Sequence, residues 1–201
     1  MKKIITLVLV LVMTLSMVAC VPTNNNETTG DNTVSGPASA LELMSNVWAK
    51  FPEASKFPVM GGDGDNANWE GPGIVTLPGA EGNALWNLYV PDNQLANITE
   101  AATLMHAMNL NTFSSGTLKL ADGADAAAVA KALSDAILST HWMCGFPERM
   151  IVVSVGNYLV VAFGHDGVSF PEGGKLITDF LASLQAVYAD AKVLYDEAIT
   201  G

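Results

Sequence analysis

The chain has 201 residues, of which 50% are hydrophobic and 14% charged, and its formal net charge is −11 at pH 7. This length suits one globular domain with an additional segment, and the apolar content is sufficient for a packed core. The negative charge repels phosphate backbones, which excludes nucleic acid as a partner. Cys20 and Cys144 are the two cysteines, so the sequence also excludes a framework of disulfides.

Residues 1–19 are predicted to be a lipoprotein signal peptide. Two lysines precede an uncharged apolar run at 4–18, which suits a secretory signal and is shorter than the roughly 20 residues of a transmembrane helix. The run ends in Met-Val-Ala-Cys at 17–20, which resembles a bacterial lipobox, although Met17 replaces the usual leucine. This resemblance implies cleavage before Cys20 and attachment of lipid, palmitate included, to that cysteine. The alternatives are an ordinary secretory signal and an uncleaved anchor.

Residues 20–38 are expected to contain the lipidated cysteine and a flexible tether. They are rich in Asn, Thr, Gly and Ser, and they bury too little apolar surface to offset the entropy of ordering. A single globular domain is predicted over 39–201. The protein is therefore expected on the extracytoplasmic face of the cell membrane, where two or three lipid chains at Cys20 would give stable attachment.

The domain is predicted to begin with a helix that ends at Phe51 and Pro52. Ser39 suits the N-cap of this helix, with Glu42 three residues later. Its buried face consists of apolar residues at helical spacing, namely Leu41, Met44, Val47 and Trp48. An irregular segment rich in Gly, Asp and Asn follows over 59–78.

The middle of the chain is predicted to contain a strand at 84–90, because this stretch is rich in aromatic and apolar residues. A helix is expected next, since apolar residues recur at three- and four-residue steps at Leu95, Ile98, Ala102, Met105 and Met108. The segment 106–115 is open to a helical or an extended conformation. A short strand at 116–120 follows.

Another helix is predicted after this strand. Asp122 suits its N-cap, and Asp125 lies in the positive field of its first turn. The helix is expected to stop near Cys144 and Gly145, ahead of Pro147. Its predicted buried stripe contains Val129, Leu133, Ala136 and Ile137.

Two apolar runs at 150–155 and 158–163 are predicted to form a β-hairpin, because Gly156-Asn157 supplies the positive φ angles of a tight turn. A last helix is expected over 174–199, and it should pack on the hairpin through Phe180, Leu184, Val187 and Leu194. This order of elements indicates the α+β class. We expect a two-layer domain in which a small mixed or antiparallel sheet, with a C-terminal hairpin, is covered by about four helices.

Five segments between residues 84 and 168 carry a resemblance to a known group of proteins. In chain order they are WNLY, MNLNTFSSGTLKL, DGADAAAVAKAL, WMCGFPE and VGNYLVVAFG. Their succession is similar to that of short lipoproteins of low-GC Gram-positive bacteria that carry a conserved domain of unknown function. The resemblance implies a lipid-anchored extracytoplasmic domain with a strand, a helix that begins at an acidic turn, and a hairpin. It implies no activity and no catalytic or binding residue.

The segment Trp-Met-Cys-Gly-Phe-Pro at 142–147 superficially resembles the redox motif of thioredoxins. Dithiol exchange needs a resolving cysteine, and the segment has none. Cys144 is instead expected to be a buried structural cysteine. The alternative is a nucleophile that His141 and Glu148 assist once the fold brings the three together.

Other polar residues indicate no defined site. The loop from Gly61 to Glu70 has oxygen ligands near the spacing of a calcium loop, but it departs from the EF-hand pattern at three positions. A solvated turn is therefore favoured over an irregular cation site. Asn109, Asn111 and Ser114 either line a ligand groove or, as we favour, bond to nearby backbone. The histidines are too dispersed for a local metal motif.

The sequence contains no recognisable catalytic, cofactor or metal motif. It therefore favours a non-enzymatic ligand-binding or accessory domain, anchored in the membrane through Cys20, whose partner is an unknown protein or small molecule. The alternative is an envelope enzyme with a site assembled only in three dimensions around Cys144 and His141. No cofactor, metal or nucleic acid is expected to bind.

Overall fold

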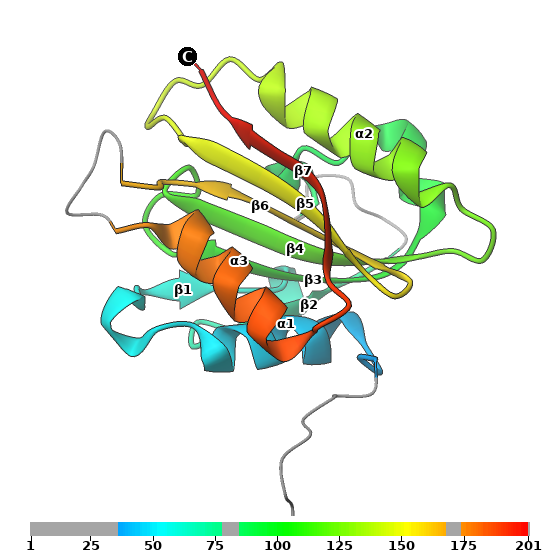
Figure 1. Cartoon of the computed structure of the whole chain (residues 1–201), viewed down its shortest axis with the longest axis horizontal. Coiled ribbons are helices and arrows are strands. Elements are labelled where there is room, and N and C mark those ends of the chain that lie inside the picture. The colour runs from blue at the N-terminus through cyan, green and yellow to red at the C-terminus, as the bar shows by residue number, and fades with distance from the viewer. Residues whose placement is uncertain (1–35, 78–84, 168–173, 201) are drawn as a thin grey trace, which may run out of the picture. The chain divides into compact units, whose positions relative to one another are not determined.

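An antiparallel β-sheet of seven strands runs through the centre of the domain (Figure 1). The computed structural model describes residues 36–77, 85–167 and 174–200. The strands lie in the order β1-β3-β4-β6-β5-β7, and β2 pairs with β3 at a position next to that of β1. Their bounds are β1 (Val59–Met60), β2 (Gly73–Val75), β3 (Ile98–His106), β4 (Phe113–Leu120), β5 (Arg149–Val155), β6 (Tyr158–Gly164) and β7 (Lys192–Ala198).

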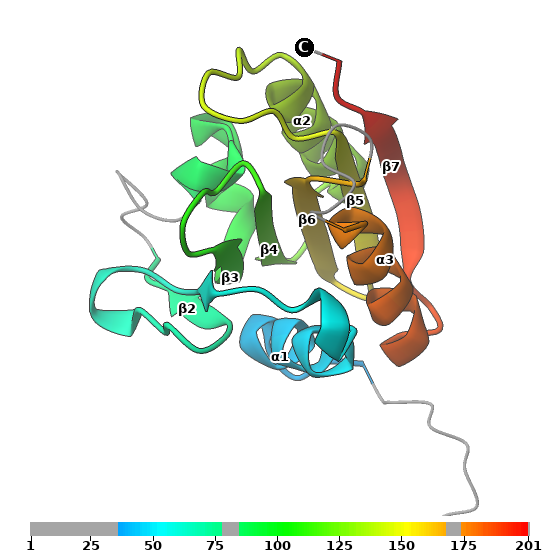
Figure 2. The same ribbon diagram turned by 90° about the vertical axis from the view of Figure 1, so that its left-hand side faces the viewer.

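Helices cover both faces of this sheet. One face is covered by α1 (Ala40–Lys50) and α3 (Leu176–Val187), and the other by α2 (Ala126–Leu138), as Figure 2 shows. The predicted α+β class, with helices on an antiparallel sheet, is confirmed. Short 3₁₀ helices lie between the larger elements: η1 (Glu53–Ser55), η2 (Gly64–Asn66), η3 (Trp86–Leu88) and η4 (Asp92–Asn97).

Two apolar clusters form the core, one on each face of the sheet. Alternate residues of a strand point to opposite faces, so Val152 of β5 joins the cluster under α2, while Ile151 and Val153 join the cluster under α1 and α3. This burial on both faces explains why β5 and β6 are almost continuously apolar. All described residues belong to one compact unit, Thr33–Gly201, and both clusters lie within it.

The predicted signal peptide at 1–19, the lipidation site Cys20 and the tether up to residue 35 lie outside the described residues. Among the residues that the structure describes, no helix combines the length and apolarity needed to cross a bilayer.

Two local predictions are confirmed. Ser39 is the N-cap of α1, where its Oγ accepts a hydrogen bond from the Glu42 N–H at 3.0 Å, and the helix ends before Phe51. The strands β5 and β6 form the predicted hairpin. In its turn, Gly156 has a φ of +54°, a conformation that glycine adopts without strain.

The predicted strand at 84–90 and the predicted helix at 95–108 are wrong. In place of the strand, the chain forms η3, which buries Leu88 and exposes Trp86. In place of the helix it forms η4 and then β3, in which every residue of 101–105 is buried. A strand that is covered on both faces shows no alternation of apolar and polar residues, so its apolar positions can also match helical spacing.

The segment 106–115, for which the sequence allowed a helical or an extended conformation, forms a turn and then enters β4, which begins at Phe113. The predicted strand at 116–120 is therefore confirmed as the later part of β4. Its residue Gly116 lies opposite Thr103 of β3 and Val161 of β6, in the middle of the sheet.

The helix α2 is shorter at both ends than predicted. Its N-cap is Asp125, whose Oδ1 accepts the N–H groups of Ala127 at 3.0 Å and Ala128 at 3.1 Å. Asp122 does not cap it, because a turn with Gly123 at a φ of +80° separates the two. The helix ends at Leu138 rather than near Cys144, since the hydroxyls of the next two residues donate to a carbonyl of its last turn. In its predicted stripe, Val129, Leu133 and Ile137 are buried and Ala136 is half-buried.

The predicted terminal helix at 174–199 is correct only in its first half. α3 ends at Val187, and the chain then forms β7, which pairs with β5. Phe180 and Leu184 pack on the hairpin side as predicted, whereas Leu194 belongs to β7 and packs with the cluster on the opposite face. The unpaired edge of β5 offers backbone partners to this last segment, and that pairing outweighs its helical spacing.

Candidate functional site

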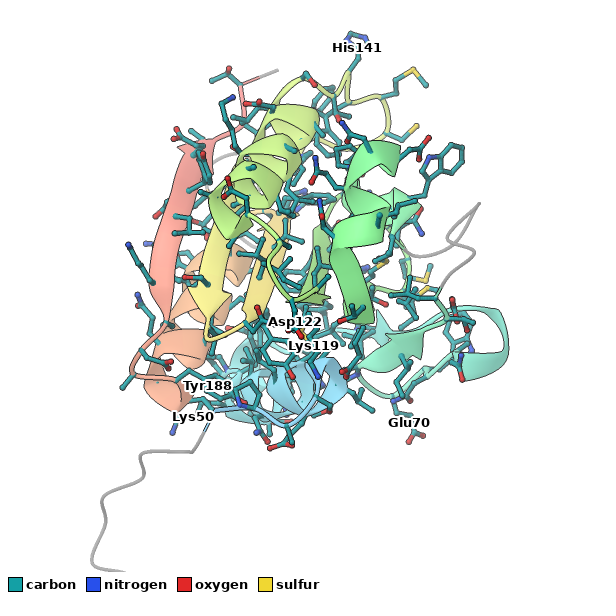
Figure 3. The ribbon with its side chains drawn as sticks, turned by 90° about the vertical axis from the view of Figure 1, so that its right-hand side faces the viewer. Lys50, Glu70, Lys119, Asp122, His141 and Tyr188 are labelled. Carbon is teal, nitrogen blue, oxygen red and sulfur yellow. The ribbon has the colours of Figure 1, made fainter. Side chains whose placement is uncertain are left out.

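A groove of about 610 Å³ lies on the face of the sheet that α2 covers. Figure 3 shows this side of the molecule, where α2 lies beside the 3₁₀ helices. The walls of the groove come from η3, from the start of η4, from the turn between β3 and β4, and from the end of α2. We call it the η3 groove. The described residues that line it are Trp86, Asn87, Tyr89, Val90, Pro91, Asp92, Leu110, Asn111 and Ala136.

The helix η3 is seated on the sheet by two leucines. The N–H groups of Leu88 and Tyr89 donate to the carbonyls of Leu85 and Trp86 at 3.1 and 3.0 Å, which closes the 3₁₀ turn. The turn buries both leucines and leaves Trp86 71% exposed. Leu88 lies over Gly116 of β4, where a Cβ atom would overlap Leu88 Cδ1. The absence of a side chain at Gly116 therefore lets η3 approach the sheet and present Trp86 to solvent.

Tyr89 has a left-handed backbone, with a φ of +58° and a ψ of +31°. Bulky residues rarely adopt this conformation, so the surroundings of Tyr89 must compensate for its cost. Its ring meets that of Trp142 edge-on, with centroids 5.2 Å apart, and lies 5.7 Å from that of Phe163. Burial raises the pKa of the Tyr89 hydroxyl, which therefore stays protonated at neutral pH. These contacts fix the Tyr89 side chain in the wall of the η3 groove.

Among the residues that the structure describes, Asp92 is the one formally charged residue in the lining of the η3 groove. It is the first residue of η4, follows Pro91 and is exposed. Its carboxylate forms no hydrogen bond or ion pair with any residue that the structure describes, and the same holds for the side-chain amide of Asn87. The groove thus combines an aromatic wall with a carboxylate and an amide that are both available to a ligand.

Two asparagines tie the β3–β4 turn to the loop after α2. Asn109 Nδ2 donates to the Cys144 carbonyl at 3.3 Å, and Asn111 Nδ2 donates to the carbonyls of Cys144 at 3.4 Å and Gly145 at 3.1 Å. Ser114 Oγ donates to another backbone carbonyl at 2.8 Å. The favoured prediction, that these three polar residues bond to backbone, is confirmed. Asn111 also lines the η3 groove. At this residue, therefore, hydrogen bonds to backbone and a place in the wall of a groove occur together.

His106 holds the same turn at its base. Its Nδ1 accepts hydrogen bonds from the N–H groups of Met108 at 3.1 Å and Asn109 at 3.2 Å, which places the proton of the neutral ring on Nε2. Burial, together with the nearby His165, lowers the pKa of His106. The neutral ring that accepts both hydrogen bonds is therefore favoured, and the turn keeps its shape at neutral pH.

Large apolar side chains are exposed in the loops beside the η3 groove. Met108 is 83% exposed, Met143 78% and Phe146 51%. The hydrogen bonds of Asn109 and Asn111 bring the turn that carries Met108 next to the loop that carries the other two. Exposed apolar side chains that gather in this way mark interaction or ligand sites. We call these three residues the apolar rim.

Cys144 is exposed, so the expectation of a buried structural cysteine is wrong. The loop after α2 instead buries Trp142, whose ring packs 5.4 Å from that of Phe163. The Trp142 Nε1 is buried and has no hydrogen-bond partner among the described residues. With the indole turned inward, the two residues that follow are left exposed.

Within the described residues, no hydrogen bond links Cys144 to either of its proposed partners. The side chain of His141 points outward beyond the end of α2 (Figure 3), and in the described part of the chain no hydrogen bond joins it to Cys144. Glu148 Oε2 accepts the N–H of Asp166 at 2.7 Å. The structure therefore does not join the three residues of the nucleophile hypothesis through hydrogen bonds.

Hydrogen bonds of the Asp63 side chain hold the loop from Gly61 to Glu70. Asp63 Oδ2 accepts the Thr76 N–H at 2.8 Å, and Asp63 Oδ1 accepts the Asn66 amide at 3.3 Å and the Thr76 hydroxyl at 3.2 Å. Within the described ranges, no group of three or more His, Cys, Asp and Glu side chains could hold a metal ion. Asp63 thus joins the loop to the end of β2.

Sequence reasoning missed Trp86, Tyr89 and Asp92 as site residues. The prediction of a strand at 84–90 placed the two aromatic residues on opposite faces of a sheet. The available signal was the Pro91-Asp92-Asn93 run directly after the aromatic residues, which indicates a turn beside them.

No similar protein supplies a function for the η3 groove, and the resemblance to Gram-positive lipoproteins stays a prediction. Comparison of the chain with family models, with curated proteins and with solved structures finds no match.

Proposed function

We propose that this protein is a non-enzymatic binding domain, held by lipid at Cys20 on the extracytoplasmic face of a cell membrane, and that it takes the apolar part of its ligand into the η3 groove. The observation that carries this proposal is the exposure of Trp86 in the wall of a groove of about 610 Å³. Grooves of this volume accommodate drug-sized molecules or a few side chains of a peptide.

The walls of the groove are fixed before any ligand arrives. Leu88 seats η3 on the sheet, ring contacts hold Tyr89, and the amides of Asn109 and Asn111 hold the β3–β4 turn. A preformed wall loses little conformational entropy when a ligand binds. The large face of Trp86 can then contribute its full apolar area to the contact.

The proposed location is supported by the sequence. The apolar run at 4–18 leads into Cys20, and the polar stretch up to residue 38 could span roughly 60 Å when extended. A domain on such a tether would keep its groove close to the membrane but clear of the lipid surface.

Binding of N-phenyl-1-naphthylamine, a neutral dye that fluoresces in apolar surroundings, tests the groove in the isolated unit Thr33–Gly201. We expect saturable binding that Trp86→Ala weakens roughly tenfold, because the indole supplies much of the apolar contact. Trp69→Ala is the matched control, since Trp69 is 66% exposed and lies outside the groove. Absence of saturable binding, or equal affinity of the Trp86→Ala variant and the wild type, would overturn the proposal.

Metabolic labelling with an alkyne analogue of palmitate tests the anchor in cells that produce the full chain. The wild-type protein should be labelled and should sediment with membranes, whereas Cys20→Ser should be unlabelled. Wild-type protein with a free thiol at Cys20 in the culture medium would contradict the proposed attachment.

A further inference from the structure

We infer that the η3 groove recognises a cationic group, an ammonium or a guanidinium, that is attached to an apolar body. The inference rests on the proposed function and adds the chemistry of the ligand.

The first support is the charge of the groove. Among the described residues that line it, Asp92 is the one that carries a charge, and none is a lysine or an arginine. The carboxylate is exposed and forms no hydrogen bond or ion pair within the described residues, so it is free to pair with a cation. The net charge of −11 also attracts cations and repels anions at longer range.

The second support is the pair of aromatic side chains in the same wall. The faces of tryptophan and tyrosine rings attract cations, and aromatic cages bind organic ammonium groups in this way. The chain already makes such contacts elsewhere, because Lys56 Nζ lies 5.4 Å from the Trp48 ring and Lys119 Nζ lies 5.8 Å from the Tyr158 ring. No cation of the described residues covers Trp86 or Tyr89.

The third support is the backbone of Tyr89. A φ of +58° is costly for a bulky residue, and costly conformations of this kind concentrate at binding sites. Here the left-handed residue ends η3 and leads through Val90 and Pro91 to Asp92. The strained turn thus brings an aromatic ring and a free carboxylate into the lining of one groove.

A matched pair of soluble probes separates the cation from the apolar body. The compounds 2-phenylethylammonium and 2-phenylethanol share the same ring and chain, and they differ in an ammonium or a hydroxyl group. Each is titrated into the ¹⁵N-labelled unit Thr33–Gly201, with the indole N–H signal of Trp86 as the readout and Trp86→Phe to assign that signal. At low salt we expect the ammonium to bind about tenfold more tightly than the alcohol.

Asp92→Asn should bring the ratio of the two affinities close to one, mainly by weakening the binding of 2-phenylethylammonium. The variant should fold, because the Asp92 side chain forms no hydrogen bond or ion pair with the described residues. Asp122→Asn is the matched control, since Asp122 is exposed and lies near the opposite end of α2 from His141 (Figure 3). That substitution should leave the ratio as it is in the wild type.

The outcomes separate the inference from the proposed function. Saturable dye binding, with equal affinity for the ammonium and the alcohol, would overturn the inference and leave the proposed function standing. Absence of dye binding together with no shift of the Trp86 signal would overturn both. Acetyl-Phe-Arg-amide adds a peptide source of the same chemistry, and tighter binding of this peptide than of 2-phenylethylammonium would assign the cation to a peptide side chain.

Discussion

The side chain of Leu88 occupies the space that a Cβ atom at Gly116 would need. A methyl group at position 116 would overlap Leu88 Cδ1. The other nearby atoms are far enough away to accommodate it, so Leu88 Cδ1 is the obstacle. The contact joins η3, which carries Trp86, to the middle of β4. The position of the η3 groove therefore depends on a glycine in the centre of the sheet.

Gly116→Ala should displace Leu88 and lower the free energy of unfolding by about 1 to 3 kcal/mol, the range typical of overpacked cores. It should also weaken dye binding, because η3 moves with Leu88. Urea unfolding and dye titration measure the two effects. In the Leu88→Ala background, where the space is free, the same substitution should cost far less. An equal cost in both backgrounds would show that Leu88 is not the obstacle.

The amide of Asn111 joins the β3–β4 turn to the loop after α2, and its removal gives a second prediction. Asn111→Ala should cost about 1 kcal/mol of stability, because two carbonyls lose a donor at 3.1 and 3.4 Å. Amide hydrogen exchange should increase in residues 139–147 but not in the β5–β6 hairpin. Asn93→Ala, at an exposed position of η4, is the control. Unchanged exchange in the loop would show that Asn111 does not hold it.

Local signals predicted the parts of the fold that depend on neighbours in sequence. Ser39 caps α1 through a bond to a residue three positions away, and Gly156 supplies a turn that few other residues could form. The strands β3 and β7 could not be predicted in this way. Their apolar residues fit helical spacing, and what makes them strands is pairing with distant segments, as in the alignment of Tyr195 with Val152.

The candidate site was harder to predict than the fold. Trp86 and Tyr89 line one groove because a 3₁₀ turn and a left-handed residue replace the expected strand. The left-handed backbone of Tyr89 is stabilised by Trp142 and Phe163, which are distant in sequence. Cys144 was expected to be buried because its neighbours are apolar, but only Trp142 among them turns fully inward.

A charged network around Arg149 predicts a loss of stability in acid. Arg149 Nε and Nη2 donate to the two carboxylate oxygens of Asp196 at 2.7 and 2.8 Å, and Nη1 donates to Asp166 at 2.8 Å. The hydrogen bond from Arg149 lowers the pKa of Asp196. A carboxyl group whose pKa is lower in the folded state stabilises the fold above its unfolded pKa, about 3.9, and this contribution is lost as the pH falls through the folded value.

Asp196→Asn should therefore lower the free energy of unfolding at pH 7 by about 1 kcal/mol or less, since the Asp196 side chain is 38% exposed and solvent screens the pair. The difference from the wild type should shrink between about pH 5 and pH 2, where the wild-type carboxyl becomes protonated. Urea unfolding at several pH values measures this, with Asp190→Asn as the control. A difference that stays constant down to pH 2 would show that the ion pair with Arg149 is not its cause.

The exposed thiol of Cys144 separates the binding function from the enzymatic alternative. In the isolated unit Thr33–Gly201, Cys144 is the one cysteine, so iodoacetamide reports on it alone. Because the residue is exposed, it should react without denaturant, which a buried cysteine would not do. Its rate should lie within about threefold of that of glutathione, since the described residues place no hydrogen-bonding base beside it. Mass spectrometry measures the rate.

His141→Ala should leave this rate unchanged, because no hydrogen bond in the described structure joins His141 to the thiol. Cys144→Ser should leave dye affinity unchanged, because the Cys144 side chain does not line the η3 groove. A rate tens of times that of glutathione, and lost in His141→Ala, would instead identify an activated thiolate and favour the enzyme. Reaction only in denaturant would contradict the position of the loop after α2, and with it the place of the apolar rim beside the groove.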